Sequence, residues 1–223
     1  MKITPLRFQA YESGPNVSAL LQMPHDPIGI AALAHGAGAG ITHANMENIA
    51  AALGRHKLAT LRYQFPFMER GGGRDRPAVS LSTIRKACAT AQQLAPNLPL
   101  IAGGHSFGGR MTSMAAAEQT IPNVCGLFFC SYPLHPADKP SDQRTLHLPA
   151  ITVPMLFLSG TRDRMMTYDL LEPTLLKLGS LVEFQWLETG DHGYKTLKRT
   201  RDPEDDIFDQ MARLIRQWFL RIQ

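Results

Sequence analysis

The pentapeptide Gly104-His105-Ser106-Phe107-Gly108 joins two segments of different character. An apolar run precedes it at residues 98–103, and a helix-like run follows it at residues 110–117. A serine on a sharp turn between a strand and a helix is held in a strained backbone conformation with its hydroxyl exposed. Glycines on both sides remove the Cβ atoms that would crowd such a turn. A glycine-rich loop with an incidental serine is the alternative, and the flanking patterns favour a nucleophile at Ser106.

Short apolar runs alternate with amphipathic segments along the rest of the chain. This alternation is typical of an α/β fold in which helices cover both faces of a mostly parallel sheet. The first two strands flank a turn at Gly14 and should pair in antiparallel fashion at the sheet edge. Strands are predicted at residues 6–11, 17–23, 29–34, 58–63, 98–103, 125–130, 154–158 and 182–187, and helices at residues 45–53, 84–94, 110–117, 168–178 and from about Pro203 onward.

Glycine and proline positions set the expected ends of these elements. Gly54 is expected to stop the helix at residues 45–53. Residues 66–77 and 132–149 show no clear element, and long loops of this kind often bind ligands or form lids. Neither loop interrupts the alternation, so the sequence predicts one domain over residues 1–223.

Composition and charge exclude several classes of protein. The chain has 223 residues, of which 44% are hydrophobic and 19% charged, a globular balance. Its three cysteines fit no disulfide framework and are expected to be reduced core thiols of a cytoplasmic protein. We predict neither a signal peptide nor a membrane span. The net charge is +4, and the one basic cluster, at residues 195–201, is followed at once by acidic residues. We interpret it as a solvated loop and expect no nucleic-acid partner.

A nucleophilic serine needs a general base and an acid that orients the base. Asp163 and His192 follow in that order, each on a loop after a predicted strand, at the sheet edge where Ser106 also lies. Of the eight histidines, only His192 comes after the last strand. His105 adjoins Ser106 but should point away from its hydroxyl. Asp191 is an alternative acid, and Asp163 is favoured because adjacent residues rarely aim one side chain at the other's ring nitrogen.

Backbone amides should stabilise the oxyanion that forms during acyl transfer. Phe107 follows the nucleophile and is one expected donor. The other is expected from the loop His35-Gly36-Ala37-Gly38-Ala39-Gly40, where Ala37 is favoured and Gly36 or Gly38 could take the role. These glycines also suggest a dinucleotide-binding loop, but the third glycine comes one position too early and Arg62 ends the next strand in place of an acid. The hydrolase reading explains the same glycines together with the serine, the acid and the base.

The chain resembles the α/β-hydrolase superfamily over nearly its whole length. More narrowly, it resembles a small dienelactone-hydrolase-like group that includes testis-expressed and chromatin-complex relatives. The stretches that carry this resemblance, beyond the triad, are residues 33–38, 61–69, 106–111, 132–136 and 159–163. The resemblance implies a three-layer sandwich with little or no cap, Ser106 as nucleophile, Asp163 as acid and His192 as base. Dienelactone hydrolases proper carry a cysteine nucleophile where this chain has Ser106, and Met165-Met166 replaces the Pro-Phe-Gly expected after the acid.

The sequence therefore predicts a serine hydrolase that acts on a small acyl substrate. A carboxylic ester is the favoured class, and thioesters and amides remain open. A catalytically idle scaffold is the alternative, against which the complete triad argues. No cofactor and no metal site are expected, since phosphate-loop and zinc motifs are missing. A weaker hypothesis is an anionic substrate, based on the arginines Arg62, Arg70, Arg74, Arg76 and Arg110.

Overall fold

The computed structural model describes residues 1–197 and 206–223. Within them, one sheet has the strand order β1-β2-β4-β3-β5-β6-β7-β8. β1 pairs with β2, and β2 with β4, in antiparallel fashion, whereas every later pairing is parallel. The strands are β1 (Lys2–Gln9), β2 (Asn16–Met23), β3 (Gly29–Ala34), β4 (Leu58–Tyr63), β5 (Leu100–His105), β6 (Val124–Cys130), β7 (Met155–Gly160) and β8 (Val182–Leu187).

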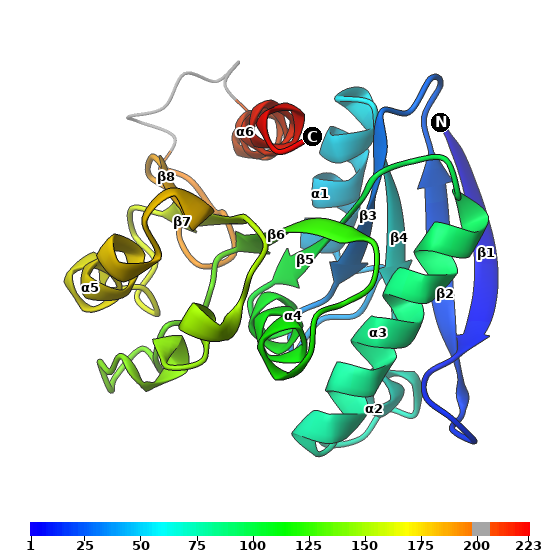
Figure 1. The fold of residues 1–223 in the computed structure, drawn as a ribbon, viewed down its shortest axis with the longest axis horizontal. Coiled ribbons are helices and arrows are strands. Elements are labelled where there is room, and N and C mark those ends of the chain that lie inside the picture. Colours follow the sequence, from blue (N-terminus) through cyan, green and yellow to red (C-terminus); the bar gives the residue numbers. More distant parts are fainter. Residues whose placement is uncertain (198–205) are drawn as a thin grey trace.

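Helices cover both faces of the sheet and make three layers (Figure 1). α1 and α6 pack together on one face, and α3 and α4 pack together on the other. The helices are α1 (Ala44–Arg55), α2 (Pro66–Glu69), α3 (Pro77–Leu94), α4 (Phe107–Glu118), α5 (Tyr168–Leu178) and α6 (Ile207–Arg221), with 3₁₀ turns η1 (Gln143–Thr145), η2 (Leu148–Ala150) and η3 (Gly179–Leu181). In residues 1–197 and 206–223 no large cap rises from this core, so the predicted α/β three-layer sandwich is confirmed.

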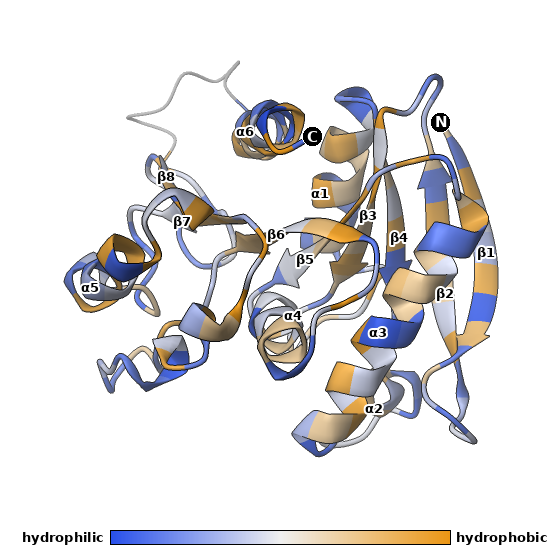
Figure 2. Ribbon diagram, in the orientation of Figure 1, coloured by the Kyte–Doolittle hydropathy of each residue, from blue (hydrophilic) through white to orange (hydrophobic). Residues whose placement is uncertain are grey.

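The buried strands supply both hydrophobic cores at once. All six residues of β3 are buried. Ile30 and Ala32 enter the core under α3 and α4, whereas Ala31 and Leu33 enter the core under α1 and α6. Successive strand residues point to opposite faces, so a strand covered on both sides must be apolar throughout. Figure 2 shows the corresponding pattern of hydrophobic residues along the inner strands and the sheet-facing sides of the helices.

Several elements begin or end at residues other than those predicted. α1 continues through Gly54 to Arg55, with His56 as its C-cap, so the predicted stop at Gly54 is wrong. Gly54 is buried, and a Cβ there would lie 2.7 Å from Gln22 Nε2. Gly54 therefore lies inside the helix because a larger residue would crowd the side chain of Gln22. The loop at residues 66–77 contains the short α2. The predicted start of the last helix at Pro203 lies outside the described residues, and α6 is capped by Asp206, whose carboxylate accepts the Phe208 N–H.

The β5–α4 turn passes very close to the end of β3. A Cβ added at Gly108 would lie 2.6 Å from the Ala34 carbonyl and from the His35 oxygen, which are backbone atoms. Real Cβ atoms do not approach so closely, and backbone cannot rotate away as a side chain can. Gly108 thus lets the nucleophile turn and the loop after β3 come together.

Replacing Gly108 by alanine should destabilise the fold. We expect Gly108→Ala to lower the free energy of unfolding by about 1–3 kcal/mol through overpacking. Gly73→Ala is the matched control, because nothing lies within 4 Å of a Cβ at Gly73, and it should change stability by less than about 0.5 kcal/mol. Urea unfolding measures both, and equal midpoints for the two variants would contradict the close-approach argument.

Candidate active site

Ser106 lies at the junction of β5 and α4 with φ 51° and ψ −117°. Residues other than glycine avoid positive φ, so the backbone is strained there. Two hydrogen bonds hold the turn in place. The Ser106 N–H donates to the Cys130 carbonyl at 2.9 Å, and the Arg110 N–H donates to the Ser106 carbonyl at 3.1 Å. The strained turn predicted from the sequence is therefore present.

The His192 ring contacts Ser106 and Asp163 with its two nitrogens. Nε2 lies 2.8 Å from Ser106 Oγ, and Nδ1 lies 2.8 Å from Asp163 Oδ2. Because a carboxylate only accepts hydrogen bonds, Nδ1 carries the proton and donates it. Nε2 is then the acceptor for the serine hydroxyl. This arrangement can take a proton from Ser106 while the carboxylate steadies the charged ring.

The two candidate acids have different surroundings. The Asp163 side chain has no exposed surface, and its Oδ1 accepts the Met165 N–H at 2.8 Å. Asp191 Oδ1 accepts the N–H groups of Gly193 and Lys195, each at 2.9 Å. The structure thus brings Asp163 to the histidine ring, and Asp191 shapes the loop that carries His192.

His105 ties the nucleophile turn to the loop of His192. Its Nε2 lies 3.0 Å from the His192 carbonyl oxygen and donates to it. Burial lowers the pKa of His105 to about 4, so the ring is neutral near pH 7. As the sequence predicted, the His105 ring nitrogen is not directed to the Ser106 hydroxyl but bonds the His192 carbonyl oxygen. The contact with His192 was missed, because no sequence spacing reveals that a residue at the end of β5 meets a carbonyl 87 positions later.

A pocket of about 110 Å³ opens at Ser106. Ala37 and Phe107, the two predicted oxyanion donors, line it together with Ser106, whereas Gly36 and Gly38 do not. Met165, which follows Asp163, also reaches the pocket. Its lining residues are Ala37, Arg74, Ser106, Phe107, Arg110, Pro133, Arg144 and Met165.

His35 fastens the loop that carries Ala37. Its Nδ1 donates to the Gly36 carbonyl at 2.6 Å, and its Nε2 accepts the Phe65 N–H at 3.0 Å. Burial lowers the pKa of His35 to about 4, which keeps the ring neutral in this role. The Phe65 ring also packs edge-to-face on Phe107, with centroids 5.5 Å apart. One buried cluster therefore supports both candidate oxyanion residues.

The arginines singled out in the sequence separate into two groups. Arg74 and Arg110 line the pocket. Arg62 is buried and donates to the Ile41 carbonyl, and Arg70 pairs with Asp75 at 2.7 Å. Arg76 precedes α3 as its N-cap residue and is not among the lining residues.

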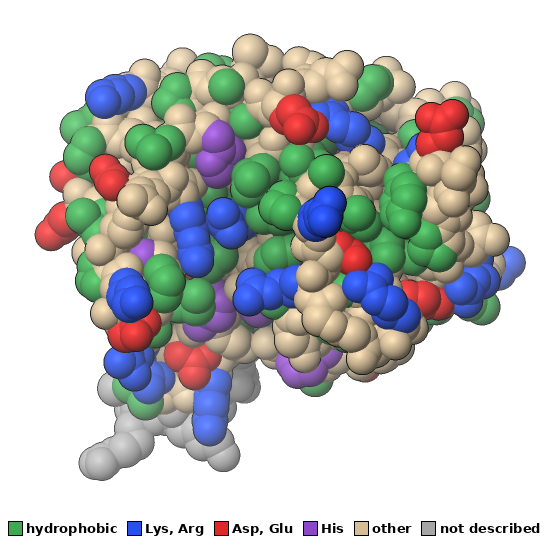
Figure 3. Space-filling model, turned by 90° about the horizontal axis from the view of Figure 1, so that it is seen from below, with side chains coloured by type: hydrophobic (Ala, Val, Ile, Leu, Met, Phe, Trp, Pro, Cys, Tyr) green, Lys and Arg blue, Asp and Glu red, His purple; other side chains and the backbone are tan. Residues whose placement is uncertain are grey.

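Arg144 was missed by the sequence analysis. It belongs to η1, within the loop at residues 132–149, and lines the pocket. The signal that could have found it is its place in a long loop of a predicted hydrolase. Several Lys and Arg side chains gather across the middle of the face seen in Figure 3.

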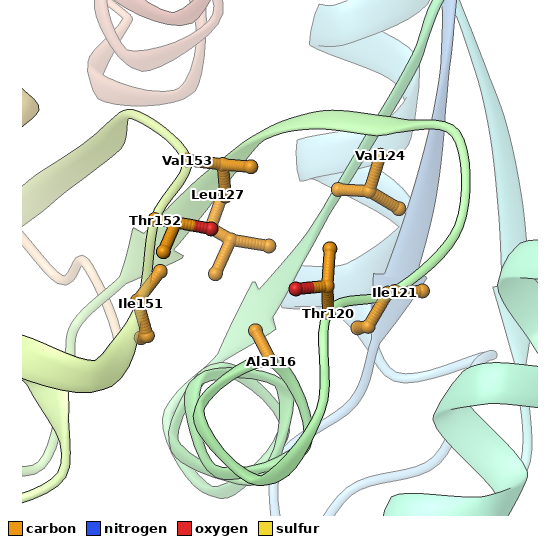
Figure 4. A pocket seen from close by; sticks show the side chains of 8 residues that line it. All are labelled: Ala116, Thr120, Ile121, Val124, Leu127, Ile151, Thr152 and Val153. Atoms are coloured by element: carbon orange, nitrogen blue, oxygen red, sulfur yellow. The ribbon is translucent and has the colours of Figure 1, made fainter.

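Other hollows in the described chain are larger but lie away from Ser106: about 510 Å³ beside β1 and β2, and about 320 Å³ where β7 and β8 begin against the end of α6. A hollow beside α4 holds only about 10 Å³, which is roughly the least that one water molecule needs. Its lining comes from α4, the loop after α4, β6 and the segment before β7 (Figure 4), namely Ala116, Thr120, Ile121, Val124, Leu127, Ile151, Thr152 and Val153. Within residues 1–197 and 206–223, no group of three or more His, Cys, Asp or Glu could hold a metal ion. In the same residues, no helix has the length and apolar character needed to cross a bilayer.

A family model described as an alpha/beta hydrolase domain matches residues 29–220. The chain belongs to this family. A dienelactone hydrolase from Anabaena variabilis has a TM-score of 0.75 at 19% identity, with 99% of each chain covered. An esterase domain from Rhodothermus marinus has a TM-score of 0.74 at 18% identity, with both chains fully covered. A serine hydrolase without a lid from Xanthomonas campestris has a TM-score of 0.72 at 15% identity, covering 99% of this chain and 94% of that one.

These three structures share the fold of this chain. The family model confirms the predicted membership of the α/β-hydrolase superfamily. Family membership supports a hydrolase activity.

Acidification should weaken the fold through His35. The pKa of His35 is about 4 in the folded protein and near 6.5 when unfolded, so the unfolded chain binds a proton first as the pH falls. Its contribution to stability is complete above pH 6.5 and declines toward pH 4. Between pH 7 and pH 5 the loss is about 2 kcal/mol.

Urea unfolding at pH 7 and pH 5 tests this. His35→Gln removes the titrating ring, so the difference between the two pH values should shrink by about 2 kcal/mol. His25→Gln is the control, because the His25 side chain is 94% exposed, and it should keep the wild-type difference. Equal pH dependence in His35→Gln and wild type would contradict the assignment.

Proposed function

We propose that this protein is a serine hydrolase that cleaves small carboxylic esters through an acyl-enzyme. Ser106 is the nucleophile, His192 the base and Asp163 the acid. The observation that supports this most is the His192 ring, which reaches Ser106 Oγ and Asp163 Oδ2 at 2.8 Å each. A nucleophile within hydrogen-bond reach of a base, itself oriented by a buried carboxylate, is the geometry that acyl transfer needs.

Proton transfer follows from the direction of these hydrogen bonds. His192 Nε2 accepts the Ser106 proton as Oγ attacks the substrate carbonyl, and the ring becomes an imidazolium beside Asp163. The same proton then passes to the leaving alcohol, which departs and leaves the acyl group on Oγ. A water molecule replaces the alcohol, loses a proton to Nε2 and attacks the acyl carbon. Collapse of that intermediate releases the acid and returns the proton to Ser106.

Phe107 and Ala37 are proposed to stabilise the tetrahedral oxyanion with their backbone N–H groups. Both residues line the pocket at Ser106, and both are supported by the cluster around His35 and Phe65. Fixed donors act without reorganisation when the charge develops. A pocket of about 110 Å³ has roughly the space of four water molecules, which suits a short acyl group. Thioesters and amides would react through the same steps.

Loss of the nucleophile should abolish most activity. We expect Ser106→Ala to lower kcat on an activated short-chain 4-nitrophenyl ester by roughly 10³–10⁶. Ser180→Ala is the control, since Ser180 is an exposed residue of η3, and it should retain wild-type rates. Turnover by Ser106→Ala near the wild-type value would eliminate this mechanism.

A serine-directed probe distinguishes the hydrolase from an idle scaffold. A fluorophosphonate should label the folded wild-type protein at Ser106, because the probe requires an activated serine. Ser180→Ala should label equally, and Ser106→Ala should not label at all. Folded wild-type protein that stays unlabelled between pH 6 and 9 would favour the scaffold.

A further inference from the structure

Three guanidinium groups from three separate segments line the pocket at Ser106. Arg74 precedes α3, Arg110 lies one turn into α4, and Arg144 belongs to η1. Two of them contact the nucleophile turn, Arg110 through its backbone N–H and Arg74 through its side chain. The Arg110 N–H donates to the Ser106 carbonyl at 3.1 Å, and the Arg74 guanidinium lies over the ring of Phe107, 5.9 Å from its centroid. The positive charge is therefore placed beside the nucleophile.

No acidic side chain neutralises these three arginines within the described residues. None of the pocket's lining residues is acidic, and none of the three arginines forms an ion pair there. Arg144 Nη1 donates only to the Pro133 carbonyl, at 2.8 Å. Arg110 Nε is buried and has no hydrogen-bond acceptor in the part of the chain that the structure describes. Other arginines of the chain form ion pairs with acidic residues, for example Arg7 with Glu69 at 3.0 Å and Arg221 with Glu183 at 2.6 Å.

The fold holds these like charges together at a cost. Burial lowers the pKa of the Arg144 guanidinium, and the charges of Arg110 and Arg74 lower it further. A buried network keeps the segments in place despite this repulsion. Ser113 Oγ lies 2.7 Å from His147 Nε2 and donates to the Arg110 carbonyl at 2.8 Å. Tyr132 donates its hydroxyl proton to the Arg144 carbonyl at 2.8 Å.

We infer that the natural ester carries an anionic group, a carboxylate or a phosphate, which Arg74, Arg110 and Arg144 bind while Ser106 attacks the carbonyl. Planar guanidinium groups match both anions with paired hydrogen bonds, and such charge-assisted bonds are strong in a partly buried site. The anion would supply the negative charge that no described acidic residue gives the three arginines. This inference rests on the proposed function, since it names the substrate of the same pocket.

A matched pair of esters tests the inference in the wild-type protein. 4-Nitrophenyl hemiglutarate carries a carboxylate, and its methyl ester is neutral and of nearly the same length. After subtraction of the enzyme-free rates, kcat/KM for the anionic ester should exceed that for the neutral ester at least about 10-fold at low salt. Raising the salt concentration should reduce this ratio, because part of the attraction is screened. A ratio of one or below would overturn the inference and leave the esterase intact.

Arginine variants then separate anion binding from support of the oxyanion. Arg144→Gln and Arg110→Gln should each lower the ratio of the two kcat/KM values about 10-fold or more. Arg213→Gln removes an exposed charge of α6 and should leave the ratio unchanged. A variant that slows both esters by the same factor would overturn the inference, since the arginine would then act on the oxyanion common to both.

Binding to the Ser106→Ala variant gives a readout that does not depend on turnover. Glutarate and inorganic phosphate should each be titrated by calorimetry into Ser106→Ala and into the double variant with Arg144→Gln. Binding of either anion that weakens about 10-fold or more in the double variant supports the site, and the tighter anion identifies the preferred group. Binding of neither would overturn the inference. Anion binding without turnover of either ester would overturn the proposed esterase and support the anion site.

Discussion

The close contact between the nucleophile turn and the end of β3 is the constraint on which the site depends. Gly108 lies where any Cβ would be 2.6 Å from the backbone of Ala34 and His35. Because Gly108 lets the main chain of the turn approach this loop so closely, Ser106 and Ala37 line one small pocket. The parallel register of β3 and β5 brings their carboxyl ends to the same edge of the sheet. Gly108 then allows the turn after β5 to come into contact with the loop after β3.

A second set of hydrogen bonds holds the base, His192, at this pocket. The loops after β7 and β8 are joined by backbone hydrogen bonds, such as Arg162 N–H to the Gly190 carbonyl at 2.9 Å. His105 holds the His192 carbonyl from the side of β5. His192 and His105 therefore have different roles. His192 faces the serine and the carboxylate, whereas His105 is neutral and fixes the main chain of its partner.

Much of the fold follows from the amino-acid pattern. β3 is covered on both faces and apolar throughout, and for this reason it has the boundaries that the sequence predicts. β4 also has its predicted boundaries, although it carries the buried polar residues Thr60 and Arg62. Edge strand β1 is harder, because its exposed residues break the pattern, and it begins at Lys2 instead of residue 6. Gly54 was misread since a glycine needed for packing looks the same in sequence as one that ends a helix.

In the candidate site too, some residues could be predicted from the sequence and others could not. Ser106, Asp163 and His192 could be predicted because each follows a strand in a fixed chain order. The hydrogen bond of His105 and the place of Arg144 could not, since both depend on how loops without a periodic pattern fold over the sheet. Long loops are where local rules give the least information.

The backbone of Ser106 has a consequence for how this position can evolve. A residue at φ 51° and ψ −117° costs of order 1–3 kcal/mol unless it is glycine. Glycine at position 106 would relieve that strain and remove the hydroxyl. The residue that best stabilises the turn is thus one that cannot carry out the proposed chemistry, and a selection for thermostability alone would drive this position away from serine. A serine that persists there under such selection would mark a requirement for activity.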